Sequence, residues 1–185
     1  HATVFLINPV EAELGEGALV ELGKVAKGET FEIIVEKKSG FPFQWESIEV
    51  DSTALPTGWV VEKDSSPQTL ILRVSVPVSA KESIQNIPVE VFSPDNNGTS
   101  QSFTAEIVVK KNLLRAEVKS LAKDAIVYEP VVFSAVIIND SIAPHAVVVY
   151  SSLPNYWFEP VSLELKSKET KDFNLVVFPK TYGKR

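Results

Sequence analysis

The chain has no cysteine and no methionine among its 185 residues, and it has only two histidines. Without cysteine it can form neither a disulfide framework, a thiolate metal site nor a cysteine nucleophile. Its longest apolar runs, such as residues 146–150, are too short to cross a bilayer, so we expect no membrane insertion in this segment. Because His1 is not an initiator methionine, we expect either a processed product or an excised fragment.

Strongly basic stretches are missing as well. The formal net charge is −6, and no basic run exceeds a pair such as Lys110-Lys111. Nucleic acids and anionic membranes are bound through clustered Lys and Arg that displace counterions, so neither is an expected partner. The hydrophobic content of 44% is ordinary for a globular protein, which indicates that a buried core can form.

The chain does contain many short segments of β type, separated by turn residues. Between residues 69 and 76, Leu70, Leu72 and Val74 alternate with side chains that would face the other way, which is the period of a strand. Gly28 stands between two such segments, where a turn with positive φ favours glycine. No window combines helical spacing with caps at both ends. The pattern predicts an all-β fold.

The β segments form two similar series about one hundred residues apart. Three features recur in the same order: residues 30–35 at 132–137, the Leu-Pro and Trp of 55–59 at 153–157, and the strand end Val76-Pro77 at Phe178-Pro179. About one hundred residues is the length of an immunoglobulin-like sandwich. We therefore predict two consecutive immunoglobulin-like β-sandwich domains, at residues 1–111 and 112–185, joined by a short linker.

The second series is shorter than the first. We expect its strands at residues 115–120, 125–128, 131–138, 145–150, 157–165 and 173–178. It lacks counterparts of the last two strands of the first copy, at 87–92 and 102–109, so the second domain is predicted to be incomplete at its C-terminal strands. Such a domain has a long unpaired edge and half a core. Two explanations remain open: a chain that has been cut short, or a partner that supplies a strand by β-augmentation.

Two stretches resemble known families of surface domains. Residues 22–31, Leu-Gly-Lys-Val-Ala-Lys-Gly-Glu-Thr-Phe, are similar to a motif that begins the second strand of many prokaryotic Ig-like surface repeats. Residues 55–62 with 70–77 resemble the core of the NPCBM-associated domain of α-galactosidases and of CARDB-like adhesion modules. The second copy departs from this pattern, with Tyr156 in place of the glycine before the tryptophan. The resemblance implies a secreted or cell-surface module and carries no catalytic residue.

Aromatic side chains are the main candidates for a binding site. Phe41, Phe43 and Trp45 alternate, so they would share one face of a strand, and residues 156–158 form a second aromatic cluster. On an exposed face such rings could stack on sugars. The alternative is that they fill the core, with Trp59 and the tryptophan of the second cluster in equivalent core positions.

Catalytic and metal-binding constellations are not evident. Apart from the terminal His1, the only imidazole is that of His145, which follows a proline in a predicted loop. Glu46 and Glu49 alternate onto opposite faces of their strand, so they do not form the facing carboxylate pair of a glycosidase. The alternating oxygen ligands from Asp95 onward lack the following glutamate of a calcium loop. We expect no enzyme, no cofactor and no metal site.

Two triplets, which begin at Asn97 and Asn139, match the acceptor for N-glycosylation in predicted loops. Together with the resemblance, they favour an extracellular or cell-surface location. We expect a non-enzymatic spacer, adhesion or interaction module of a larger protein, which contacts other domains of that protein and a protein or glycan ligand. The alternative function is a carbohydrate-binding accessory module of a glycoside-processing enzyme. A pilus chaperone is a weaker alternative, because the paired basic residues that anchor a subunit's C-terminus are missing.

Overall fold

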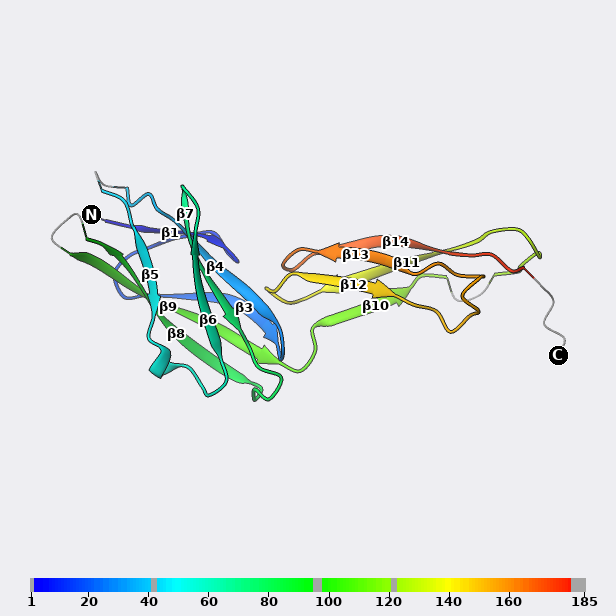
Figure 1. Ribbon diagram of the computed structural model, residues 1–185, viewed down its shortest axis with the longest axis horizontal. Helices are drawn as coiled ribbons and strands as arrows, with labels where there is room; N and C mark the ends of the chain where they lie inside the picture. Colours follow the sequence, from blue (N-terminus) through cyan, green and yellow to red (C-terminus); the bar gives the residue numbers. More distant parts are fainter. Residues whose placement is uncertain (1, 41–42, 95–97, 121–122, 181–185) are drawn as a thin grey trace. The chain divides into compact units, whose positions relative to one another are not determined.

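The computed structural model describes the chain except residues 1, 41–42, 95–97, 121–122 and 181–185 (Figure 1). The described part holds fourteen strands and one short 3-10 helix, so the prediction of an all-β fold is confirmed. The chain divides into two compact units. Unit 1 comprises His1–Leu113 with Ser141–Ala143, and unit 2 comprises Leu114–Asp140 with Pro144–Arg185.

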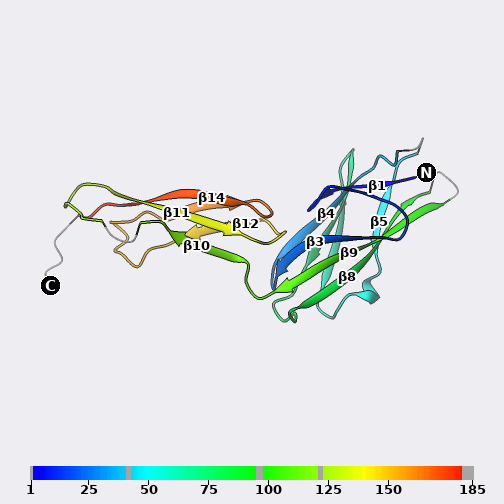
Figure 2. The ribbon, with the colours of Figure 1, turned by 180° about the vertical axis from the view of Figure 1, so that it is seen from behind.

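Unit 1 is built from two sheets that form two layers (Figure 1). The first sheet contains, in spatial order, β2 (Ala12–Leu14), β1 (Val4–Asn8), β4 (Thr30–Glu36), β7 (Thr69–Ser75) and β6 (Val60–Ser65). The second contains β3 (Ala18–Ala26), β9 (Thr99–Lys110), β8 (Ser83–Ser93) and β5 (Ser47–Val50). All neighbours are antiparallel except β3 and β9, which run parallel side by side (Figure 2).

The core of unit 1 lies between these two sheets. Leu70, Leu72 and Val74 are buried while the residues between them are partly exposed, so the alternation predicted for this strand is confirmed. The strands opposite follow the same period and bury Ile87 and Phe103 from β8 and β9. Alternate apolar side chains from both layers therefore fill one continuous core, as in an immunoglobulin-like sandwich.

The turn before β4 has the conformation that the sequence predicts. Gly28 has a φ of 80°, and its N–H donates to the carbonyl of Val76 at 2.9 Å. A Cβ at this position would lie 3.0 Å from Cγ1 of Val78. Both the left-handed backbone and the crowding favour glycine here.

Unit 2 is a smaller arrangement of five strands. One sheet has the order β10 (Leu114–Val118), β11 (Val131–Asn139) and β14 (Thr170–Val177), and the other pairs β12 (His145–Val149) with β13 (Val161–Leu165). The inward face of β11 buries Val131, Ala135 and Ile137. The strand expected at residues 125–128 is a wrong prediction, because Tyr128 has a φ of 69° and belongs to a turn.

That turn reveals the internal repeat in atomic detail. The N–H of Tyr128 donates to the carbonyl of Pro179 at 2.6 Å, as the N–H of Gly28 does to Val76. The antiparallel ladder of β11 with β14 likewise repeats that of β4 with β7. These bonds align Gly28 with Tyr128 and Val76 with Pro179, so the echo of residues 30–35 begins near residue 130 rather than at 132.

The second layer is where the two units differ. In unit 1 β6 pairs with β7, whereas in unit 2 the corresponding strand β13 pairs with β12. Among the described residues of unit 2, no strands correspond to β8 and β9. The second layer of unit 2 therefore has two strands where that of unit 1 has four.

The packing of unit 1 gives a first prediction. Replacing Leu72, which has no exposed surface, by alanine should lower the free energy of unfolding by about 2–5 kcal/mol, because the side chain leaves a cavity between the sheets. Ile84→Ala is the matched control, since Ile84 is 64% exposed and its loss should change stability by less than about 0.5 kcal/mol. Urea unfolding followed by tryptophan fluorescence measures both, and equal effects would contradict the assigned core.

Candidate functional site

The aromatic residues proposed from the sequence lie in or against the core of unit 1. Trp45 is 0% exposed, and its Nε1 donates to the carbonyl of Thr3 at 3.0 Å. Phe43 is half-buried and meets Trp45 edge to face, with ring centroids 5.5 Å apart. Phe41 lies outside the described residues. Because stacking on a sugar requires an exposed ring face, Trp45 follows the core alternative and cannot serve as a binding platform in the folded unit.

The backbone explains this placement. The segment before β5 is held by the Trp45 N–H, which donates to the carbonyl of Lys37 at 2.7 Å, and by an isolated bridge between Lys38 and Gln44. The regular strand begins only at Ser47. The alternation of Phe43 and Trp45 does place them together, but on the side that faces the core.

The two glycosylation candidates have different outcomes. Asn97 lies outside the described residues. Asn139 is the last residue of β11 rather than part of a loop; it is 1% exposed, and its Nδ2 donates to the carbonyl of Lys166 at 3.0 Å. Attaching a glycan to this nitrogen would break the hydrogen bond and require the side chain to leave its site. The folded state therefore disfavours modification at Asn139.

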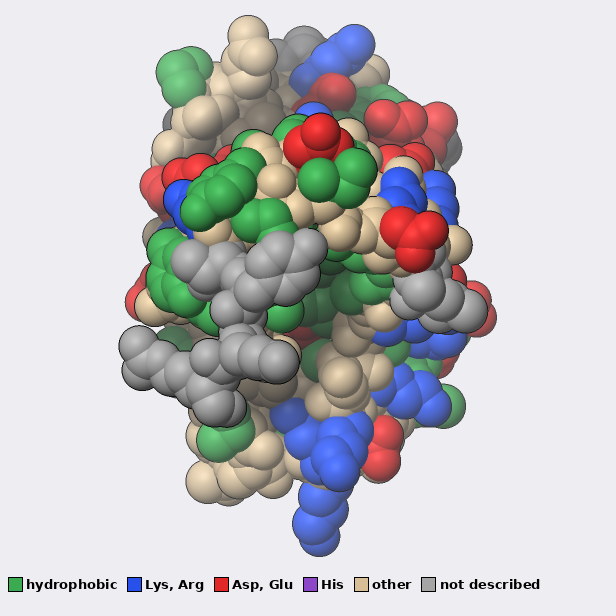
Figure 3. Space-filling view, turned by 90° about the vertical axis from the view of Figure 1, so that its right-hand side faces the viewer, with side chains coloured by type: hydrophobic (Ala, Val, Ile, Leu, Met, Phe, Trp, Pro, Cys, Tyr) green, Lys and Arg blue, Asp and Glu red, His purple; other side chains and the backbone are tan. Residues whose placement is uncertain are grey.

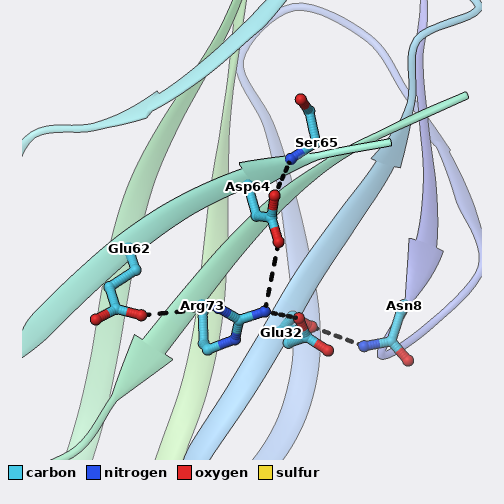
Figure 4. A network of polar contacts seen from close by, with 6 residues as sticks. All are labelled: Asn8, Glu32, Glu62, Asp64, Ser65 and Arg73. Atoms are coloured by element: carbon cyan, nitrogen blue, oxygen red, sulfur yellow. Dashed lines mark hydrogen bonds and ion pairs between the residues drawn. The ribbon is translucent and has the colours of Figure 1, made fainter. Parts of the chain in front are cut away.

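Arg73 on β7 is the centre of a charged cluster on the first sheet of unit 1 (Figure 4). Its guanidinium lies 3.2 Å from Glu32 on β4, and 3.7 Å and 3.8 Å from Glu62 and Asp64 on β6. The strand register produces this arrangement, since Glu32 and Glu62 both lie directly opposite Arg73. The side chain of Arg73 is 38% exposed, so solvent weakens each pair. We assign the cluster a structural role, as ion pairs that link three strands.

Asp51 has a lowered pKa whose cause is local. It caps the 3-10 helix η1 (Ser52–Ala54), and its carboxylate accepts hydrogen bonds from the Thr53 hydroxyl at 2.6 Å and the Thr53 N–H at 3.0 Å. These bonds, the hydroxyl's first, stabilise the charged form and hold the pKa of Asp51 below its usual value of 3.8. The stabilisation is present above pH 3.8 and is lost as the pH falls through the lowered pKa. The acid thus acts as a helix cap.

Unit 2 contains a cavity that we call the Trp157 groove. Its volume is about 730 Å³, and it is lined by Asn155, Tyr156, Trp157, Phe158, Glu159, Pro160, Val161, Ser162, Asn174, Val176, Phe178 and Lys180. Figure 3 views this end of unit 2, where hydrophobic side chains gather. The volume is in the range of small-molecule sites, which is about 300–1,000 Å³.

Main-chain hydrogen bonds fix the wall of the groove. The Trp157 N–H donates to the carbonyl of Pro154 at 2.8 Å, and the Phe178 N–H donates to the carbonyl of Trp157 at 2.7 Å. Tyr156 and Trp157 meet edge to face, with centroids 6.5 Å apart, and Tyr156 is 57% exposed. The loop thus joins the end of β14 and presents an exposed ring beside a partly buried one.

One polar atom of a groove residue has no partner among the described residues. The Nε1 of Trp157 is buried and makes no hydrogen bond within the described part of the chain. Indole N–H groups normally find an acceptor when they are buried. The groove therefore has aromatic rings in its wall, and one of them carries a buried donor without an acceptor.

The sequence indicated half of this groove. Residues 156–158 form the second aromatic cluster identified above, but Asn174, Val176 and Phe178 were not connected with it. Their spacing of two was the available signal, because it places them on one face of β14 and its extension. Trp59, the counterpart of Trp157 in the repeat, packs partly buried against the core of unit 1.

The strands place the chain among all-β proteins of the sandwich type, and the Trp157 groove is its candidate binding site. No protein-family model and no curated protein matches the sequence. Among the described residues, no group of three His, Cys, Asp or Glu side chains is placed to hold a metal ion. Within the same residues, no helix has the length and hydrophobicity needed to cross a membrane.

The Arg73 cluster gives a prediction on stability. Arg73→Gln should lower the free energy of unfolding by about 0.5–1 kcal/mol at low salt, because three carboxylates lose their common cation. Added salt should reduce this difference, since it screens the remaining repulsion. Arg115→Gln is the control, because Arg115 is 60% exposed and its pairs are longer than 3.3 Å. Thermal unfolding at two salt concentrations measures the effect. A stability difference that is the same at both concentrations would contradict the prediction.

Proposed function

We propose that the chain is a non-enzymatic interaction module of a larger extracellular or cell-surface protein, in which unit 1 is a rigid spacer and unit 2 makes the contact. The observation that supports this most is the distribution of apolar surface. Unit 2 is the smaller unit, yet it carries nine of the fourteen large hydrophobic side chains described as exposed. Contiguous exposed apolar patches on soluble domains commonly mark interaction sites.

The buried side chains show the opposite distribution. Of the thirty hydrophobic residues described as buried, only five lie in unit 2: Val131, Ala135, Ile137, Phe158 and Leu165. Unit 1 therefore holds the core that a rigid spacer needs, while unit 2 keeps apolar surface available. A second cavity of about 470 Å³ in unit 2 is lined by Phe133, Tyr150 and Leu153 among others.

The test is binding of the full chain to an array of immobilised extracellular proteins and polysaccharides. The double variant Tyr150→Ser and Leu153→Ser should lose the bound partner by about tenfold or more, since both side chains are exposed on unit 2 and line the second cavity. The matched control is Leu19→Ser with Val78→Ser, which removes exposed apolar side chains from unit 1 and should leave binding unchanged. Loss of binding in the control alone, or no binding to any member of the array, contradicts the contact role of unit 2.

A carbohydrate-binding module is the second candidate, and the Trp157 groove favours it. The exposed ring of Tyr156, the unpartnered Nε1 of Trp157 and the amide of Asn174 lie in the same groove. Stacking rings combined with amide groups suit the apolar faces and hydroxyl edges of a sugar. This moves the candidate glycan site from Phe43 and Trp45 in unit 1 to unit 2.

Trp157→Phe distinguishes this candidate. It keeps an aromatic ring but removes the N–H, so binding to a soluble polysaccharide should weaken by about 3- to 10-fold, the equivalent of one hydrogen bond. Trp59→Phe, at the corresponding position of unit 1, should bind as the unchanged chain does. Isothermal titration calorimetry gives both affinities, and equal affinities for the two variants would remove the groove as the sugar site.

A further inference from the structure

The strand β12 has the same place in the repeat as β5 of unit 1. Each follows the central strand of its unit, β11 or β4, and each precedes a Leu-Pro turn with a tryptophan, at Leu153 and Leu55. In unit 1 the edge of β5 is covered by β8, with Ser47 opposite Phe92 and Val50 opposite Val89. In the described part of unit 2, β12 pairs with β13 alone. One edge of β12 is therefore without a strand neighbour.

The composition of this edge is unusual for the molecule. Edge strands normally carry charged side chains or proline that prevent pairing with another chain. The other outermost strands described each contain at least one Asp, Glu, Lys or Arg: β2, β6, β3, β5, β10, β14 and β13. β12, with the sequence His-Ala-Val-Val-Val, has none. Its β-branched residues also have high strand propensity.

A cavity of unit 2 lies next to the residue that follows β12. The 470 Å³ cavity is lined by Phe133, Leu175 and Val177 from the inward faces of β11 and β14, and by Tyr150 directly after β12. In unit 1 the corresponding inward faces are covered by β8, whose Ile87, Val89 and Val91 are at most 1% exposed. Strand β8 of unit 1 therefore shows which side chains suit a strand at this place in the repeat: alternating apolar residues.

We propose that the free edge of β12 takes an added antiparallel β-strand from a polypeptide segment outside residues 1–185. Alternate residues of that strand are β-branched and apolar, as in β8, and they cover the cavity beside β11 and β14. Main-chain hydrogen bonds to residues 146–149 supply the affinity, and the alternating side chains supply the selectivity. This inference rests on the proposed function and specifies its partner.

Strands β8 and β10 of a second copy do not supply this strand. Its own β8 is bonded on both sides, to β5 and β9, and its apolar residues are buried. Its edge strand β10 carries Arg115 and Glu117, which would bring charges into an apolar site. Pairing of two β12 edges is a separate outcome, which the experiment below distinguishes.

The experiment uses the full chain and a synthetic peptide with the β8 sequence, Ser83–Ser93, as the probe. Two further peptides carry N-methyl groups on alternate residues, one set on the odd positions and the other on the even positions. Because only alternate N–H groups of an added strand point toward β12, one methylated peptide should lose about tenfold or more in affinity while the other keeps the affinity of the parent. Hydrogen exchange should become slower at residues 146–149 and stay unchanged at Ser47–Val50 of unit 1.

Three results would overturn the proposal. If both methylated peptides lose the same affinity, the peptide does not bind through a strand edge. If the parent peptide does not bind, a strand with alternating apolar residues is not the partner. Slow exchange at residues 146–149 without peptide, together with a dimer in analytical ultracentrifugation, assigns the edge to a second copy. A further combination separates the two proposals. If the partner found on the array requires Tyr150 and Leu153 but the β8 peptide does not bind, unit 2 makes the contact and only the added strand is wrong.

Discussion

The antiparallel ladder between β4 and β7 is the interaction on which the rest of unit 1 depends. It fixes which residues face inward, because a shift of one residue would turn Leu72 and its neighbours toward solvent. The same register brings Arg73 between acids of β4 and β6 on the outer face. One set of main-chain bonds therefore decides both the composition of the core and the pairing of the surface charges.

Unit 2 has the same ladder but a smaller second layer over it. The bonds between β11 and β14 and the turn at Tyr128 repeat those of unit 1, so the centre of the sandwich is formed. With β13 beside β12 instead of beside the central ladder, the two layers share fewer buried side chains. The exposed apolar surface of unit 2 and the open edge of β12 follow from this difference and from the absence, in the described part of unit 2, of strands that correspond to β8 and β9.

The sequence predicted the features that depend on neighbouring residues alone. The alternation of Leu70, Leu72 and Val74 and the turn at Gly28 follow from period and backbone freedom, and both are confirmed. Phe43 and Trp45 were correctly placed on one side, but periodicity does not say whether that side faces solvent or core. Tyr128 was missed because its left-handed backbone is stabilised by a bond to Pro179, far along the chain. The pairing of β13 with β12, rather than with the central ladder, likewise depends on distant segments and not on the residues of β13 alone.

The thin core of unit 2 has a consequence for how the protein responds to its surroundings. A domain that completes its core only when something binds gains stability in proportion to the logarithm of the concentration of that partner. The described part of unit 2 buries five hydrophobic side chains, so a strand that covers them adds a large share of its core. Under our proposal, the folded fraction of unit 2 rises as the β12 edge becomes occupied.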